Sequence, residues 1–127
     1  MKHMLAVLLA SVAIAAGTEV LAHHSFAAEF DASKAIRVTG TLTKIDWINP
    51  HIYFVLDVKQ PAGGTQYLLE TVPVAFARRA GITKEMLLGG GKPVEVTMFT
   101  GRKDPHVGFA RLIKFSDGRT LQLRGDR

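Results

Sequence analysis

Apolar and polar residues alternate along most of the chain after residue 35, which predicts β-strands. The first strand is expected over residues 36–47. Its apolar positions up to Leu42 share one phase, whereas Ile45 and Trp47 fall on the opposite phase. A change of phase within one strand predicts a β-bulge, and Gly40 permits a sharp bend before it.

Asn49-Pro50 ends this strand, because proline donates no hydrogen bond and its predecessor favours an extended conformation. Residues 51–58 then predict a second strand. Its even-numbered positions are apolar and face the core, and His51 and Tyr53 lie on the opposite face. A Pro-Ala-Gly-Gly turn leads into a third strand over residues 66–72, so these two strands form a hairpin.

The pattern becomes helical after Pro73. Residues 74–80 have helical spacing, Gly81 is a stop signal, and Thr83 is suited to cap one further turn that ends before three consecutive glycines. Alternation then returns in residues 94–98 and 106–115. Asp117-Gly118 predicts a tight turn into a last short strand around residues 120–123.

This order of elements predicts a mainly β fold, namely a small OB-like Greek-key barrel. We expect five to six strands with one short helix between the third and fourth. The expected organisation is a cleaved signal peptide over residues 1–22, an N-terminal arm over residues 23–34 and the barrel domain over residues 35–127.

The signal peptide is predicted from the order of residues at the start of the chain. Lys2 gives a positive start, residues 5–16 are apolar, and Val20-Leu21-Ala22 resembles a cleavage site. The apolar run is shorter than the roughly 20 residues that span a bilayer. We therefore expect a periplasmic or secreted protein with no transmembrane segment after processing. A cut after Ala15 is the alternative, and it would leave the following histidines inside a longer tail.

Composition narrows the chemistry. The chain has no cysteine, so it has neither a disulfide nor a thiol nucleophile. Cleavage after Ala22 leaves 105 residues, which is enough for one domain, and keeps the net charge of +5. The basic residues are scattered, which favours a solvated surface over a binding patch for anions.

Several segments resemble one protein family. They are His23-His24-Ser25-Phe26-Ala27-Ala28-Glu29-Phe30-Asp31, Gly40-Thr41-Leu42-Thr43-Lys44-Ile45 with Trp47, Asn49-Pro50-His51, Arg78-Arg79-Ala80-Gly81 and Asp117-Gly118-Arg119. In these segments the chain resembles the uncharacterised bacterial exported proteins grouped as domain of unknown function 6152 (DUF6152). The resemblance covers essentially the whole mature chain. It implies an exported small β-barrel, and it brings no activity with it.

His23 and His24 are candidate metal ligands. After cleavage at Ala22 the protein would begin with a free amine and two imidazoles, a nitrogen-rich set suited to Cu(II). His51 is the natural additional ligand, and His106 is a weaker candidate. The third mature residue is Ser25 instead of histidine, so the amino-terminal copper motif is absent. The alternative reading of the histidine pair is a polar arm.

Three residues are candidates for binding a ligand on the barrel face: Trp47, His51 and Tyr53. Tyr53 is placed on the non-core side with His51, where its ring is available for stacking. The alternative to ligand binding by Trp47 is a place in the hydrophobic core. For His51 the alternative is a hydrogen bond to a backbone carbonyl or to the side chain of Asn49.

Catalysis and nucleic-acid binding are both disfavoured. No mature serine lies in a nucleophile-elbow context, and basic and aromatic residues do not interleave as single-strand platforms require. Glu29 and Asp31 are expected to dock the arm on the barrel, with Phe26 and Phe30 clamping it by burial.

We therefore expect a non-enzymatic exported binding or scaffold domain of unknown ligand. One alternative is copper binding through the mature N-terminal histidines with His51. The other is a metal-free module that recognises an envelope saccharide, a lipid headgroup or a protein partner.

Overall fold

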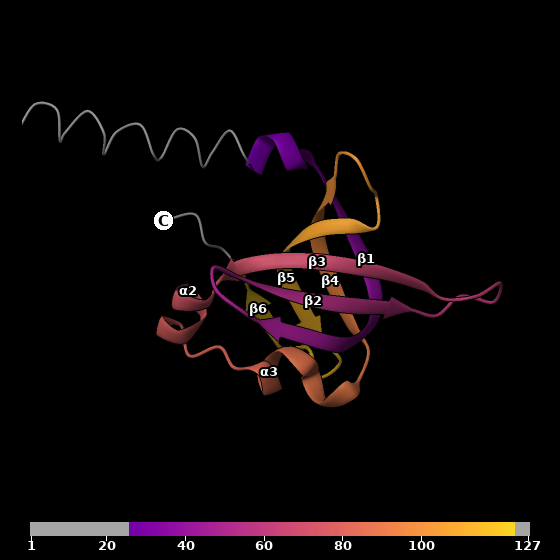
Figure 1. The fold of residues 1–127 in the computed structure, drawn as a ribbon. Helices are drawn as coiled ribbons and strands as arrows, with labels where there is room; N and C mark the ends of the chain where they lie inside the picture. Colours follow the sequence, from indigo (N-terminus) through magenta and orange to yellow (C-terminus); the bar gives the residue numbers. More distant parts are fainter. Residues whose placement is uncertain (1–25, 124–127) are drawn as a thin grey trace, which may run out of the picture.

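The computed structural model describes residues 26–123, which form a mainly β structure with a few short helices (Figure 1). Six strands form one sheet in the order β3-β2-β1-β4-β5-β6. Their bounds are β1 Phe30–Trp47, β2 His51–Val58, β3 Thr65–Pro73, β4 Val94–Gly101, β5 Val107–Phe115 and β6 Thr120–Gln122.

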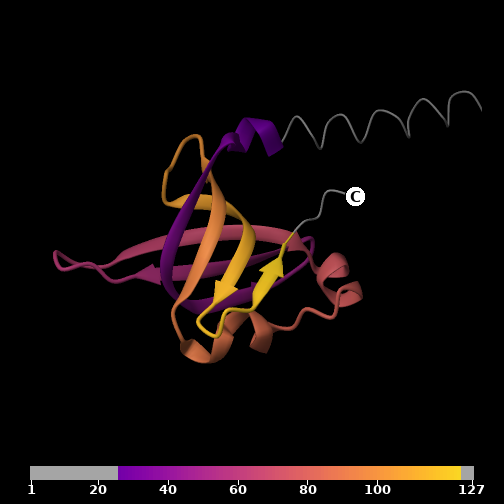
Figure 2. The ribbon, with the colours of Figure 1, turned by 180° about the vertical axis from the view of Figure 1, so that it is seen from behind.

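The sheet curls until its two halves meet. Neighbouring strands in the order above are antiparallel, and β3 also pairs with β5 in parallel, from Leu68 with Val107 to Glu70 with Phe109. Thr71 is fully buried and extends this contact, because its hydroxyl donates to the carbonyl of Ala110 at 3.2 Å. Only three residue pairs join β3 to β5, and β6 lies beside β5 outside this junction. The molecule is thus a curled six-stranded sheet rather than a regular barrel (Figures 1 and 2).

The long first strand serves both halves of the sheet. β1 pairs with β4 up to Gly40 and with β2 from Thr41 onward. The register with β2 shifts between Leu42 and Lys44, so the bulge predicted from the change of phase is confirmed. Gly40 lies where β1 changes partners, and a Cβ atom there would stand 2.5 Å from the carbonyl oxygen of Asp57. This close approach explains why the bend carries glycine.

Two short helices and a helical turn lie between β3 and β4, where the sequence predicted one short helix. They are α2 (Val74–Arg79), α3 (Lys84–Leu88) and the 3-10 turn η1 (Gly89–Gly91). Gly81 interrupts the helical stretch with a φ of +70°, a left-handed conformation that favours glycine. The predicted cap at Thr83 is confirmed, because its side chain accepts a hydrogen bond from the backbone N–H of Met86 at 3.2 Å.

The core lies between the inner faces of the strands and the two helices. The even-numbered positions of β2 are buried, as predicted from their alternation. Val74, Ala77 and Leu87 bring the helices onto the same core. In Figures 1 and 2, α3 lies below the sheet and residues 26–29 lie above it. The two ends of the molecule are therefore covered by different parts of the chain.

The described chain begins with a helical turn at residues 26–29, and β1 starts directly after it at Phe30. The predicted signal peptide and the candidate ligands His23 and His24 lie outside the described residues. Within residues 26–123 no helix has the length and apolar character needed to cross a membrane.

Substitution Gly40→Ala tests the close approach of β1 and β2. The added methyl group meets backbone, which cannot move aside cheaply, so we expect the free energy of unfolding to fall by about 2 kcal/mol. Urea denaturation measures the change. Gly64→Ala is the control, because the nearest atom to its new Cβ would be 3.5 Å away, an ordinary contact. Equal unfolding midpoints for the two variants would contradict the steric role of Gly40.

Candidate functional site

Four residues from four strands form one row on the outside of the curled sheet. Strand register places Tyr53 of β2 beside Glu70 of β3, Glu70 beside Phe109 of β5, and Phe109 beside Phe99 of β4. All four are half-buried. Paired residues on neighbouring strands point to the same side of a sheet, so these side chains form a continuous outer row.

The first described residues cover the aromatic end of this outer row. The ring of Phe26 lies 5.1 Å from that of Phe109 and 6.3 Å from that of Phe99, both edge to face. Phe30 lies 5.6 Å from Phe109 and is only 4% exposed. These contacts confirm that Phe26 and Phe30 anchor the N-terminal part of the chain. We call residues 26–31 the docked arm.

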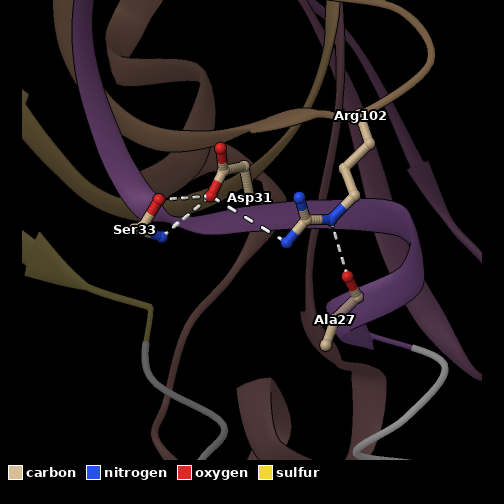
Figure 3. A network of polar contacts seen from close by, with 4 residues as sticks. All are labelled: Ala27, Asp31, Ser33 and Arg102. Carbon is tan, nitrogen blue, oxygen red and sulfur yellow. Dashed lines mark hydrogen bonds and ion pairs between the residues drawn. The ribbon is translucent and has the colours of Figure 1, made fainter.

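Arg102, just after β4, holds the docked arm from its polar side (Figure 3). Its backbone N–H donates to the carbonyl of Glu29 at 2.8 Å, and its Nε donates to the carbonyl of Ala27 at 2.7 Å. Its guanidinium also lies 4.0 Å from Oδ1 of Asp31. The arm is therefore tied by both its backbone and its side chains.

Asp31 links the arm to the start of β1. Its Oδ1 accepts hydrogen bonds from the backbone N–H of Ser33 at 3.1 Å and from the Ser33 hydroxyl at 2.6 Å. These bonds, followed by the positive charge of Arg102, lower the pKa of Asp31 below its usual value. The Asp31 carboxylate is therefore ionised at neutral pH, as its predicted role in docking the arm requires. Glu29 instead contributes its backbone carbonyl, which accepts a hydrogen bond from the backbone N–H of Arg102.

His51 and Glu70 form a polar pair next to the outer row. Nδ1 of His51 contacts Oε1 of Glu70 across the β2–β3 pairing. The Asn49-Pro50 peptide bond is cis, and the carbonyl of Pro50 accepts from the N–H of Val74 at 3.1 Å, which fixes the corner before His51. The His51 side chain is 35% exposed and that of Glu70 is 15% exposed. His51 therefore pairs with the carboxylate of Glu70, and not with a backbone carbonyl or the side chain of Asn49, the partners predicted from the sequence.

The pKa of Tyr53 is raised by the buried and negatively charged surroundings of the same region. Burial raises the pKa of its phenol, and the negative charges of Glu70 and Glu29 raise that pKa further. Glu29 belongs to the docked arm and Glu70 to β3. The phenol of Tyr53 therefore senses a carboxylate on each side of the junction between arm and sheet.

A groove of about 510 Å³ lies along this junction. Its apolar lining includes Phe30 of the arm and Val107 of β5. Its charged lining consists of three carboxylates and one ammonium group, from Glu29, Glu70, Asp104 and Lys103. We call it the arm groove. Its carboxylates outnumber its ammonium group on a chain whose net charge is +5, so the charge of the arm groove is opposite in sign to that of the chain as a whole.

Among the described residues, the structure brings two of the sequence-predicted site residues together and gives Trp47 and His106 other neighbours. Tyr53 and His51 lie on the same outer face and share Glu70 as a neighbour. Trp47 is half-buried, pairs with Ile52 and packs against the core. His106 contacts Asp104, and its ring lies 5.3 Å from that of Tyr67.

No group of three or more His, Asp or Glu side chains within residues 26–123 is placed to hold a metal ion. His23 and His24, the other predicted ligands, lie outside that range. The described part of the chain therefore forms no such group, and His51 contacts a single carboxylate there, that of Glu70.

Several residues of the site do not stand out in the sequence. Alternation places Glu70 on the outer phase of β3, but its contact with His51 depends on the bulged register between β2 and β3. Phe99 and Phe109 resemble ordinary strand residues until strand pairing brings them together. Arg102 is one of 16 basic residues, with no motif to mark it. The parallel pairing of β3 with β5, which places Glu70 beside Phe109, could not be predicted from the sequence.

Comparisons with known proteins give one result. A family model described as "Family of unknown function (DUF6152)" matches residues 8–110. No curated protein and no solved structure matches the chain. The family match spans the docked arm, Tyr53, His51, Glu70 and the arm groove, so the whole candidate site lies within the family domain.

The ionisation of Tyr53 tests the electrostatics of the site. The chain has two tyrosines, so a Tyr67→Phe variant leaves Tyr53 as the one remaining phenol. We expect its pKa, followed by phenolate absorbance, to lie above the usual value of about 10. Adding Glu70→Gln removes a negative charge and should lower that pKa. Glu85→Gln, on helix α3, is the matched control and should leave it unchanged. A Tyr53 pKa that does not respond to Glu70→Gln would refute the assigned cause.

Proposed function

The chain belongs to the DUF6152 family, a family of unknown function, and we propose that it is a non-enzymatic exported binding domain with an OB-like fold. The continuous pairing through β1, β2, β3, β5 and β4 supports the OB assignment. So does the helical segment between β3 and β4, because a five-stranded, partly open Greek-key barrel has this arrangement.

The arm groove is the main support for a binding function. Ligand sites are concave and largely apolar, with a few polar groups that orient the ligand. The arm groove combines an apolar lining from Phe30 and Val107 with the carboxylates of Glu29, Glu70 and Asp104. Both the arm and the sheet contribute to it, so docking of the arm creates the site.

The ligand chemistry follows from the lining. Ionised carboxylates only accept hydrogen bonds, so they select ligands that present hydroxyl or ammonium donors. The ring of Tyr53, whose strand partner Glu70 lines the groove, offers an apolar face to a sugar. An amino sugar of the cell envelope presents hydroxyl groups, an ammonium group and an apolar ring face together. We therefore propose an amino saccharide as the ligand class of the arm groove.

The proposal of binding without catalysis rests on the composition of the lining. The described residues that form the arm groove include no serine, threonine or cysteine. The imidazole of His51 is held by Glu70, a pairing that orients a base, but no nucleophile from the described lining stands beside it. Such a site is suited to holding a ligand.

Transition-metal binding is the second candidate function. The His51–Glu70 contact favours it, because a histidine that binds a metal through one ring nitrogen usually gives the other to a carboxylate or carbonyl. This candidate needs donors in addition to His51, and the sequence offers them in the histidines upstream of the docked arm.

Export is tested by the mass of the protein recovered from the cell envelope. We expect the chain to begin at His23, because Val20-Leu21-Ala22 provides the cleavage signal. A cytoplasmic fraction from the same cells is the control. Recovery of chains that retain residues 1–22, in the cytoplasmic fraction alone, would contradict export.

Ligand binding at the arm groove is tested by NMR with glucosamine as the probe. We expect amide shifts to move around Glu29, Glu70 and Gly101, with a millimolar dissociation constant suited to a single sugar unit. Glu70→Gln should weaken binding several-fold, because it removes a charged acceptor from the lining. Glu85→Gln is the control with equal charge change. Shifts that are absent at high millimolar glucosamine, or equal in both variants, would contradict the proposal.

A further inference from the structure

Two groups of opposite charge in the arm groove have no partner among the described residues. Glu29 of the docked arm and Lys103, just after β4, both line the groove. Within residues 26–123, neither the Glu29 carboxylate nor the Lys103 ammonium group forms an ion pair or a side-chain hydrogen bond. The other two carboxylates of the lining are engaged, because that of Glu70 contacts an imidazole and that of Asp104 accepts a backbone N–H. Glu29 and Lys103 are therefore the charged groups that the fold leaves to a ligand.

Hydrogen bonds fix the backbone at this end of the groove. Arg102, directly before Lys103, donates its backbone N–H to the carbonyl of Glu29 at 2.8 Å. On the other side of Lys103, the carbonyl of Asp104 accepts the N–H of Val107 at 3.2 Å. The two unpaired side chains therefore extend from fixed backbone, one from the arm and one from the loop between β4 and β5.

The two unpaired groups require different chemistry from a ligand. A carboxylate only accepts hydrogen bonds, and an ammonium group only donates them. Glu29 is therefore suited to a cationic group, and Lys103 is suited to an anionic one. A ligand with an ammonium group alone satisfies Glu29 but is repelled by Lys103. A ligand that carries both charges satisfies both residues.

We propose that the arm groove selects amino saccharides that also carry a carboxylate, with Lys103 as the residue that determines this specificity. The ammonium group of the sugar binds to Glu29, and its carboxylate binds to Lys103. This inference rests on the proposed function, because it refines the ligand class of the same groove. Muramic acid, a glucosamine with a lactyl ether, carries both groups on one sugar unit and is the probe.

The experiment compares muramic acid with glucosamine in NMR titrations of the purified protein. The two sugars share their ring and ammonium group, so the ratio of their affinities isolates the effect of the carboxylate. A contact with an exposed lysine adds little in water, so we expect muramic acid to bind about threefold more tightly. This preference should shrink in high salt, because salt screens interactions between exposed charges.

Lys103→Met should abolish the preference by changing the two affinities in opposite directions. Muramic acid loses the partner of its carboxylate and should bind more weakly. Glucosamine loses a repelling charge and should bind slightly more tightly. Lys92→Met is the matched control, because it removes the same charge from an exposed lysine outside the groove lining, and it should keep the ratio. Glu29→Gln should weaken the binding of both sugars, because both present the ammonium group.

The outcomes separate the role of Lys103 from the proposed function. If glucosamine and muramic acid bind equally, or if the preference survives in Lys103→Met, the specificity is overturned while amino-saccharide binding stands. If Lys92→Met abolishes the preference as well, the net charge of the protein causes it, and the role of Lys103 is again overturned. If neither sugar binds at high millimolar concentration, the specificity and the proposed function fail together.

Discussion

Packing of two arm phenylalanines against two sheet phenylalanines is the interaction on which the candidate site depends. Phe26 and Phe30 meet Phe109 within 6 Å, and Phe30 is almost fully buried. Burying a phenylalanine side chain stabilises a structure by about 1.5–3 kcal/mol, more than an exposed ion pair such as Arg102 with Asp31 provides. Apolar packing therefore holds the arm, and the polar contacts of Arg102 set its orientation. Without the docked arm, the groove would lose one wall and Tyr53 would lose a neighbouring charge.

The topology of the sheet makes this packing possible. β1 changes partners at Gly40, which lets the sheet curl until β3 reaches β5. That junction aligns Tyr53, Glu70 and Phe109 although they come from separate parts of the chain. Phe99 and Phe109, at one end of the outer row, are covered by the arm, and Glu70 and Tyr53, at the other end, carry polar groups. The border between the two halves is where a ligand or a metal ion would meet groups from both.

Much of the fold could be predicted from local patterns, because alternation and turn residues act over a few positions. The bulge after Leu42, the second strand and the Thr83 cap are confirmed. Local patterns also placed Tyr53 and His51 on the outer face. They could not reveal Glu70 as the partner of His51, or Phe109 as the support of Phe26, because these contacts depend on a parallel pairing between distant strands and on a shifted register. The second short helix, α3, follows the stop at Gly81 and begins at the Thr83 cap, so both of its signals could be read from the sequence.

Docking of the arm is tested most directly by proton–proton contacts between aromatic rings, measured by NMR on isotope-labelled protein in solution. The ring centroids of Phe26 and Phe109 lie 5.1 Å apart. A docked arm should give nuclear Overhauser cross-peaks between these two rings and shifted ring protons for Phe26. Random-coil shifts for Phe26, with no cross-peak to Phe109, would show that the arm is detached and would contradict its role as a wall of the groove.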